Sequence, residues 1–499
     1  MKANQLSVKS MSKSVKVAFT LLALPLALSA CSSLLRQPDP AAASNLTSTA
    51  FPTLLGQNAN DPAGSSIASQ GWSDFFTDPQ LKQLIQLGLE NNRDLRAAAL
   101  NIDKARAQYQ ISRAAQFPSL GVTAGSTTTG NKSDNTTKYN AGLALTGYEL
   151  DFWGRVANLK DSALQSFFAT QSARSTAQIS LVSSIAQYYL QLAFDQEQLK
   201  LAKQTLKSQQ ESYDLNQKQF KAGIISLVPV KQAQINVETA ILAAKNAETQ
   251  IAQDRNALTL VVGQTVPDNL LPTGAINQIT ASQNLPAGLP SELLQHRPDI
   301  AQQEFLLKAQ GGNVAAARAA YFPSITLTGN VGYGSSQLSD LFKSGSFAWS
   351  VGPSINLPIF DWGSRRATLE SARVDQKLAL NSYEKSIQTA FRDVSDVLAT
   401  RATLDERLAS QNRLVEASQS NYDLSQSRFK AGVDSYLSVL TAQNALFSSQ
   451  QAQITLKQQA LLSQVNLYTA LGGGATNSVG LDAQPVTNGN TTAAQVAKP

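Results

Sequence analysis

Apolar residues recur every seven positions along two long stretches of the chain, a spacing that predicts helices wound together as left-handed coiled coils. The first stretch runs from Ile185 to Phe220 and resumes from Val230 to Leu258. The second runs through 394–429 and resumes through 439–467. Each is interrupted at a Lys-Ala-Gly sequence, where glycine allows a tight turn between antiparallel helices. A helical bundle in solution would show the same spacing, so the helices alone assign no function.

Elsewhere, apolar residues alternate with small or polar ones, a pattern typical of strands with two different faces. This alternation occupies 120–124, 143–145, 325–333 and 347–357, with polar connections at 131–137 and about 337–346. Four strands leave two open edges, whose backbone groups lipid cannot satisfy by hydrogen bonding. The smallest transmembrane barrels have about eight strands, so a membrane barrel would need several copies, and three would supply twelve strands. A soluble β-layer beneath a coiled coil is the alternative.

The order of these elements occurs twice. Residues 213–223 (YDLNQKQFKAG) and 422–432 (YDLSQSRFKAG) agree at eight of eleven positions, at an offset of 209. Trp153-Gly154 and Trp362-Gly363 share that offset, whereas the Phe-Pro-Ser sequences at 117–119 and 322–324 are 205 residues apart. We therefore expect two structural copies.

The predicted organisation assigns every part of the chain to one segment. Each copy has an initial helix, about 79–116 or 291–320, that ends near a Phe-Pro, where proline blocks continuation. The expected segments are a signal peptide at 1–30, a lipidated extended segment at 31–70, copy one at 71–263 with its strand hairpin at 119–153, an equatorial connection at 264–290, copy two at 291–474 with its strand hairpin at 324–362, and a disordered tail at 475–499.

The composition removes several classes of protein. The chain has 41 Lys and Arg against 35 Asp and Glu, but four of the lysines and no acid lie in residues 1–30. Without that segment the balance is 37 against 35, which leaves no basic body to bind nucleic acid. The single Cys excludes an internal disulfide and a multi-cysteine metal cluster. Because His296 is the single His, a Ser-His-Asp triad could be built on that residue alone. We expect no enzyme and no cofactor.

The N-terminus has the pattern of an export signal. A basic region is followed by the apolar run 17–28, which is too short for a stable membrane helix. The sequence Leu28-Ser29-Ala30-Cys31 resembles the bacterial lipobox, and the chain's only cysteine would carry the covalent lipid. Ser32 rather than Asp follows, which in Gram-negative lipoproteins implies transfer to the outer membrane, and several acyl chains anchor firmly. An ordinary signal with a chance cysteine is the alternative, and Met11 is a second possible start.

Three further motifs carry a family resemblance. GWSDFFTDPQL at 71–81, NNRDL at 91–95 and GLPSELLQHRPDI at 288–300 resemble the outer-membrane efflux lipoproteins of the TolC superfamily, in the OprM/NodT branch. The resemblance covers roughly 71–474. It implies an α+β membrane protein in the outer membrane of a Gram-negative bacterium, a homotrimer whose twelve-stranded barrel stands on a long α-helical tunnel. It also implies a periplasmic adaptor protein and an inner-membrane pump, usually of the resistance-nodulation-division type, that exports drugs or other small molecules.

The resemblance also implies sites at the two Lys-Ala-Gly turns. These would be the periplasmic tips that contact the adaptor, at Gly223, Ser226, Val230, Gly432, Ser435 and Val439. TolC has two aspartates, three residues apart, that ring the entrance; here the matching positions are Ser438 and Thr441, and Asp434 one turn away could supply a ring of three carboxylates instead. For Asp94 and Asp299, helix capping or an arginine pair is the expected role.

Two other functions remain open on the sequence. The same duct could serve a protein-secretion system, although the lipobox and the OprM-like motifs favour small molecules. A trimeric surface fibre would need neither the tip turns nor strands that alternate for lipid.

Overall fold

The computed structural model describes residues 70–130, 134–274, 278–280 and 297–473, which fall into two compact units. One unit contains residues 103–169 and 303–383 and holds the sheet. The other contains the described parts of 70–102, 170–302 and 384–473 and holds two helix hairpins. Each unit therefore draws segments from both predicted copies. Cys31, His296 and the tail 475–499 lie outside the described residues.

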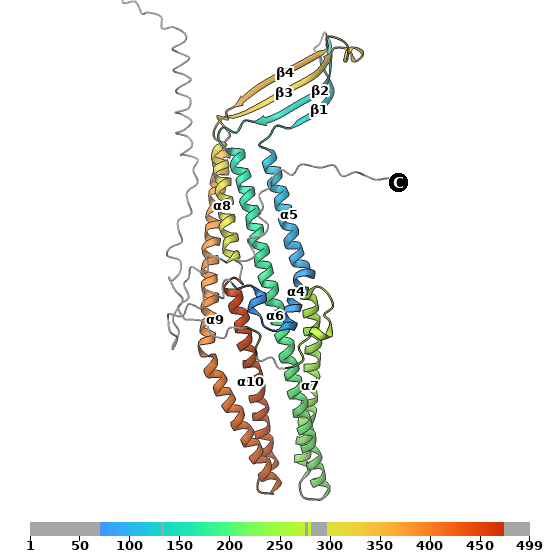
Figure 1. The fold of residues 1–499 in the computed structure, drawn as a ribbon, viewed down its shortest axis with the longest axis vertical. Helices are drawn as coiled ribbons and strands as arrows, with labels where there is room; N and C mark the ends of the chain where they lie inside the picture. Colours follow the sequence, from blue (N-terminus) through green and yellow to red (C-terminus); the bar gives the residue numbers. More distant parts are fainter. Residues whose placement is uncertain (1–69, 131–133, 275–277, 281–296, 474–499) are drawn as a thin grey trace, which may run out of the picture. The chain divides into compact units, whose positions relative to one another are not determined.

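The sheet has four antiparallel strands in the order β1-β2-β3-β4 (Figure 1). The strands are β1 (Leu120–Gly130), β2 (Asn135–Glu149), β3 (Ser324–Ser335) and β4 (Phe347–Asn356). The two predicted strand hairpins are confirmed, although β2 begins inside the expected connection 131–137. A bulge between Leu145 and Tyr148 interrupts the β2–β3 register, and Gly147 there has φ 61°, which favours glycine.

The two predicted long helix pairs are present. Helices α6 (Arg155–Lys221) and α9 (Ser364–Lys430) both have 67 residues, or ~100 Å at 1.5 Å per residue. They are followed by α7 (Leu227–Val262) and α10 (Tyr436–Ala470). Several residues at the seven-residue spacing are buried: Ile185, Leu192, Val237, Leu258, Val394 and Leu467. Phe220 is exposed, so the apolar seam of α6 ends before the tip.

The expected helical segment 79–116 is present, but it is divided into two helices. Helix α4 (Pro79–Asn91) ends at Asn92, and α5 (Arg93–Ala114) begins immediately after it. The Asn92 side chain accepts a hydrogen bond from Leu95 N (2.8 Å) and donates one to Val261 O (2.7 Å). Asn92 thus caps α5 and ties the break to the end of α7. A short helix, α3 (Trp72–Phe75), precedes α4.

The second initial helix is present in the described residues from Pro298 onward. Helix α8 (Pro298–Ala319) starts at a proline, whose missing N–H costs nothing in the first turn of a helix, and Arg297 before it is not helical. Residues 291–296 of the expected segment lie outside the described residues. Two short 3₁₀ helices, η1 (Asp268–Leu270) and η3 (Leu338–Asp340), lie in the connections.

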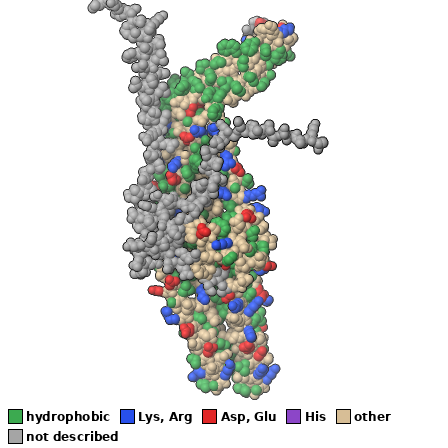
Figure 2. Space-filling view, viewed as in Figure 1, with side chains coloured by type: hydrophobic (Ala, Val, Ile, Leu, Met, Phe, Trp, Pro, Cys, Tyr) green, Lys and Arg blue, Asp and Glu red, His purple; other side chains and the backbone are tan. Residues whose placement is uncertain are grey.

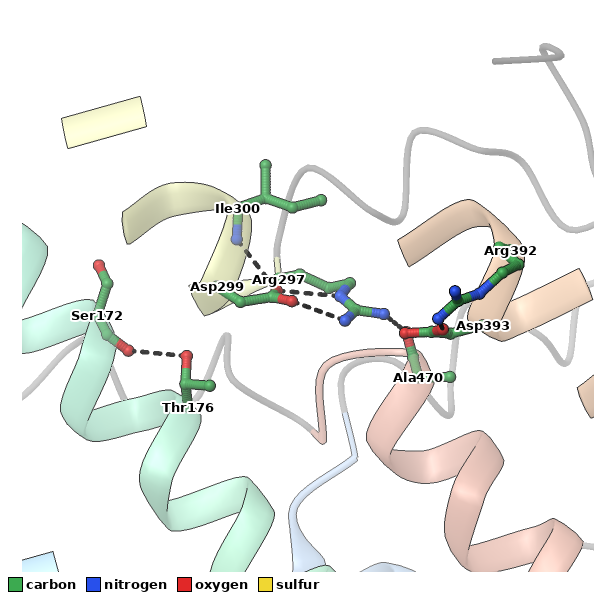
Figure 3. A network of polar contacts seen from close by, with 8 residues as sticks. All are labelled: Ser172, Thr176, Arg297, Asp299, Ile300, Arg392, Asp393 and Ala470. Atoms are coloured by element: carbon green, nitrogen blue, oxygen red, sulfur yellow. Dashed lines mark hydrogen bonds and ion pairs between the residues drawn. The ribbon is translucent and has the colours of Figure 1, made fainter. Parts of the chain in front are cut away.

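Arg297 closes one end of α10 (Figure 3). Its guanidinium is buried and pairs with both carboxylate oxygens of Asp299, Nε with Oδ1 at 3.0 Å and Nη2 with Oδ2 at 2.7 Å. Nη1 donates to the carbonyl oxygen of Ala470 at 2.6 Å. The positive charge is also stabilised there by the negative end of the helix dipole of α10. The expected arginine pair of Asp299 is confirmed, and it explains why the Arg-Pro-Asp sequence occurs here.

The packing around this contact is aromatic. Phe75 stacks on Tyr468 with ring centroids 4.5 Å apart, and the Tyr468 hydroxyl donates to the carbonyl oxygen of Gly473.

Among the described residues, no helix is both long and apolar enough to cross a membrane.

Replacing Arg297 should destabilise this unit. Arg297→Ala removes a buried forked ion pair and a helix cap, and we expect a loss of about 2–4 kcal/mol in the free energy of unfolding. Urea unfolding followed by circular dichroism measures it. Arg392→Ala, which removes an exposed pair with Asp393, is the matched control and should cost much less, because solvent screens that pair. Equal losses in the two variants would contradict the role of Arg297.

Candidate functional site

The sheet has one apolar face. Val122, Leu143, Val331 and Trp349 lie opposite one another on consecutive strands and form one apolar row across all four. Val122 is 82% exposed and Trp349 is 71% exposed. Figure 2 shows hydrophobic side chains covering much of the visible sheet. A continuous exposed apolar surface of this kind marks a membrane or protein interface.

The opposite face carries small and polar side chains. Because side chains alternate along a strand, the neighbouring row belongs to the other face, and it consists of Gly121, Ala144, Asn330 and Ser350. Further along the same face, Thr127 lies opposite Lys138. The sheet therefore separates an apolar surface from one that suits water.

The first helix tip is closed by backbone hydrogen bonds around Gly223. Its φ is 74°, a left-handed conformation that glycine adopts readily. Gly223 N donates to Phe220 O and Ile224 N donates to Gln219 O, both at 2.9 Å. This pair of bonds is the Schellman motif, which satisfies the last carbonyl groups of α6. Ser226 is exposed at the start of α7, where its hydroxyl makes no capping hydrogen bond.

The second tip repeats this backbone. Gly432 has φ 76°, its N–H donates to Phe429 O at 3.0 Å, and Val433 N donates to Arg428 O at 2.9 Å. Ser435 occupies the same exposed position before α10 as Ser226 does before α7. The two predicted tips are thus two tight turns of equal geometry.

The burial of Val230 and Val439 differs from the predicted contact surface. Val230 is 6% exposed and Val439 is 3% exposed, because both continue the apolar seams of α7 and α10 up to the first turn. Val439 belongs to a cluster with Ala233, Tyr436 and Leu440. In this structure the two valines pack between helices, so neither lies on the surface expected of an adaptor contact.

Asp434 is not an isolated carboxylate. Arg428 Nε donates to its Oδ2 at 2.6 Å and Arg428 Nη2 to its Oδ1 at 3.2 Å. Hydrogen bonding to this guanidinium lowers the pKa of Asp434. Ser438 and Thr441 are exposed on the first turns of α10, and the Thr441 hydroxyl donates to Leu437 O. A ring of Asp434 carboxylates would therefore bring its own arginines with it.

Two polar clusters between helices escaped the sequence reasoning. In the first, Ser208 of α6 accepts a hydrogen bond from Gln443 Nε2 of α10 at 3.0 Å and lies 3.1 Å from the hydroxyl of Tyr422 on α9. It links the two hairpins. Serine and glutamine are common on coiled-coil surfaces, so no sequence signal marks these as buried partners.

The second cluster is a pair of carboxyl groups, Asp195 on α6 and Asp254 on α7. Burial raises the pKa of Asp195 to about 7, aided by its hydrogen bond to Asp254. Gln191 donates to Asp195 at 2.7 Å and Gln250 donates to Asp254 at 2.9 Å. Gln191 in turn accepts from Gln458 of α10, so hydrogen bonds around the two carboxyl groups join three helices. Among the described residues, no group of three or more His, Cys, Asp and Glu side chains could hold a metal ion.

The carboxyl pair should make stability depend on pH. Asp195 is protonated in both states below its unfolded pKa of about 4, so its contribution is fully present there. Between about 4 and about 7 the unfolded chain loses this proton while the folded chain keeps it, so stability falls as pH rises and levels off above 7.

Asp195→Asn should flatten this dependence, because its amide donates to Asp254 at every pH. We expect proton uptake on folding between pH 4 and 7 to fall by up to about one proton per chain, measured from urea midpoints against pH. Asp214→Asn is the matched control, since Asp214 also accepts from a glutamine four residues away but is exposed. An unchanged slope in Asp195→Asn would contradict the shared proton.

The chain matches known proteins over most of its length. A family model described as outer membrane efflux protein matches residues 84–264 and 289–473. The antibiotic efflux pump outer membrane protein ArpC of Pseudomonas putida is 43% identical over 446 residues, which cover 88% of this chain and 92% of ArpC. The probable outer membrane lipoprotein SilC of Salmonella typhimurium is 40% identical over 425 residues, covering 84% of this chain and 91% of SilC.

A solved structure agrees with these matches. The open state of the MtrE outer membrane channel of Neisseria gonorrhoeae is similar with a TM-score of 0.76 at 35% identity, covering 88% of this chain and 97% of MtrE. The predicted family is therefore confirmed. This chain belongs to the outer membrane efflux proteins and serves as the outer-membrane exit duct of an efflux system.

Proposed function

We propose that three copies of this chain close one twelve-stranded barrel and form a passive duct for drugs or other small molecules. The observation that carries the proposal is the sheet, with one exposed apolar face, one small and polar face, and two unpaired edges at β1 and β4. In a membrane those edges must be paired, and four strands are too few to close on themselves. Three copies joined from β4 to β1 satisfy both requirements.

The two tips are the proposed contact with a periplasmic adaptor. Gly223, Ser226, Gly432 and Ser435 are exposed there, and the apolar side chains Ile224, Val228, Val433 and Leu437 are exposed beside them. Exposed apolar side chains at two tight turns suit a protein partner better than water. Val230 and Val439 support these turns from inside.

The energy for transport would come from an inner-membrane pump, most suitably of the resistance-nodulation-division type, linked through the adaptor. ArpC is named for an antibiotic efflux pump, which supports small molecules over the secretion of polypeptides. Opening would be a shift of the tip helices, with Asp434, Ser438 and Thr441 near the entrance and Arg428 neutralising the carboxylate.

Cys31 is the proposed lipid anchor. It ends a lipobox-like sequence, and the relative SilC is named a probable outer membrane lipoprotein. Anchoring at Cys31 would hold the mature N-terminus at the membrane independently of the strands.

Loss of the gene should raise the intracellular level of a fluorescent pump substrate. Restoring the wild-type gene should reverse this. A gene carrying Ile224→Asp should not, because adaptor binding would bury the new charge at an unfavourable free energy. Ile224→Val keeps the apolar surface and is the matched control. Efflux assays on cells with equal amounts of protein in the outer membrane measure the difference. Unchanged accumulation after gene loss, across a broad panel of substrates, would contradict the proposed duct.

Replacement of Cys31 should abolish lipid labelling. The chain has one cysteine, so Cys31→Ser removes the only thiol that could be acylated. Metabolic labelling with radioactive palmitate, followed by precipitation of the protein, tests this directly. Continued incorporation in Cys31→Ser would exclude the lipobox.

A further inference from the structure

The side chain of Trp362, which follows β4, packs against almost nothing in its own chain. It is 90% exposed, and its one ring contact is with Phe360, at 4.7 Å between centroids. It is also the only non-glycine residue with positive φ, at 55°, among those that the structure describes. A positive φ at a bulky residue is unusual and marks a position worth explaining. The exposed ring of Trp362 is therefore a candidate contact with a partner beyond its own strand.

The first half of the chain contains the same tryptophan with its partner in place. Trp153, just after β2, stacks on Phe322 with centroids 4.8 Å apart and planes 19° apart. Its indole Nε1 donates to the carbonyl oxygen of Pro323 at 2.7 Å. Phe322 and Pro323 come just before β3, so this contact lies at the junction where β2 pairs with β3. A stacked ring and an indole hydrogen bond together fix that junction.

The internal repeat identifies the matching partner for Trp362. Trp153 becomes Trp362 at the offset of 209, while Phe322 and Pro323 become Phe117 and Pro118 at the offset of 205. Phe117 is 61% exposed and comes just before β1. Because β1 and β4 are opposite edges of the sheet, the β4 and β1 edges that could meet belong to different copies.

We propose that Trp362 docks on Phe117 and Pro118 of a second copy of this chain. Its ring stacks on Phe117 and its Nε1 donates to the carbonyl oxygen of Pro118, as Trp153 does with Phe322 and Pro323. This contact rests on the shared barrel proposed above, and it names the residues that join one copy to the next.

The same offsets predict the register of the strands at this junction. Tyr148 faces Leu327 between β2 and β3, and the offsets convert this pair into Leu357 facing Val122 of the next copy. Both side chains are exposed in the single chain. Val122 lies on the apolar face, so Leu357 would extend that face across the junction. A register shifted by one residue would break this continuity.

A lipid headgroup is the other surface that could cover Trp362, because tryptophan is common at membrane interfaces. Lipid would not require Phe117, whereas docking does, so a double-mutant cycle separates the two. We expect Trp362→Ala and Phe117→Ala each to raise the rate of trimer dissociation in detergent by on the order of tenfold. The double variant should dissociate no faster than the worse single variant, because both remove the same contact.

Phe342→Ala is the control for loss of any exposed aromatic ring, since Phe342 lies in the connection between β3 and β4. It should leave dissociation unchanged. If Trp362→Ala and Phe117→Ala form trimers that dissociate at the wild-type rate, the contact is overturned while the shared barrel stands. If wild-type protein is monomeric by mass in detergent, the shared barrel fails and this contact fails with it.

Cysteine pairs test the register without relying on stability. Facing residues in antiparallel strands have Cα atoms about 4.5–5.5 Å apart, which a disulfide can span. In a Cys31→Ser background, Val122→Cys with Leu357→Cys should give covalent dimers and trimers on oxidation. Tyr148→Cys with Leu327→Cys, the matched pair within one chain, should run as a monomer on a denaturing gel. A Val122 and Leu357 pair that runs only as monomer would overturn the register.

Discussion

The unpaired edges of β1 and β4 are the constraint on which the rest of this structure depends. A strand edge exposes backbone N–H and C=O groups that either pair or remain in water. The chain gives its four strands an apolar face, which removes water from one side, yet supplies no fifth strand among the residues described. A second copy of the chain could supply the pairing, and the residues around the edges, Phe117 and Trp362, have the exposed aromatic rings of an interface.

The internal repeat makes this requirement easy to meet. The chain joins two similar hairpins through the pairing of β2 with β3. That pairing shows how a β4 edge could pair with the β1 edge of another copy. The two halves do not have identical sequences, and the bulge between Leu145 and Tyr148 has no counterpart in β4. Assembly would thus alternate a bulged junction with a plain one, giving threefold rather than sixfold symmetry.

Periodic features of the fold followed from the sequence, whereas local interruptions did not. Seven-residue and two-residue spacings record burial along single elements, so the long helices and the strand pairs were predictable. The break at Asn92 depends on a hydrogen bond to Val261, far away in sequence. The burial of Val230, the Arg428–Asp434 pair and the shared proton of Asp195 likewise arise from contacts between side chains that no spacing rule reports.

The Arg428–Asp434 pair has a consequence for any protein that binds the tips. The positions that match it in the first tip are Gln219 and Ile225, which cannot form an ion pair. Two turns of nearly equal backbone geometry therefore present different chemistry, because only the second carries this ion pair. A partner assembled from identical subunits would meet two kinds of site in alternation and would bind them with unequal sensitivity to salt.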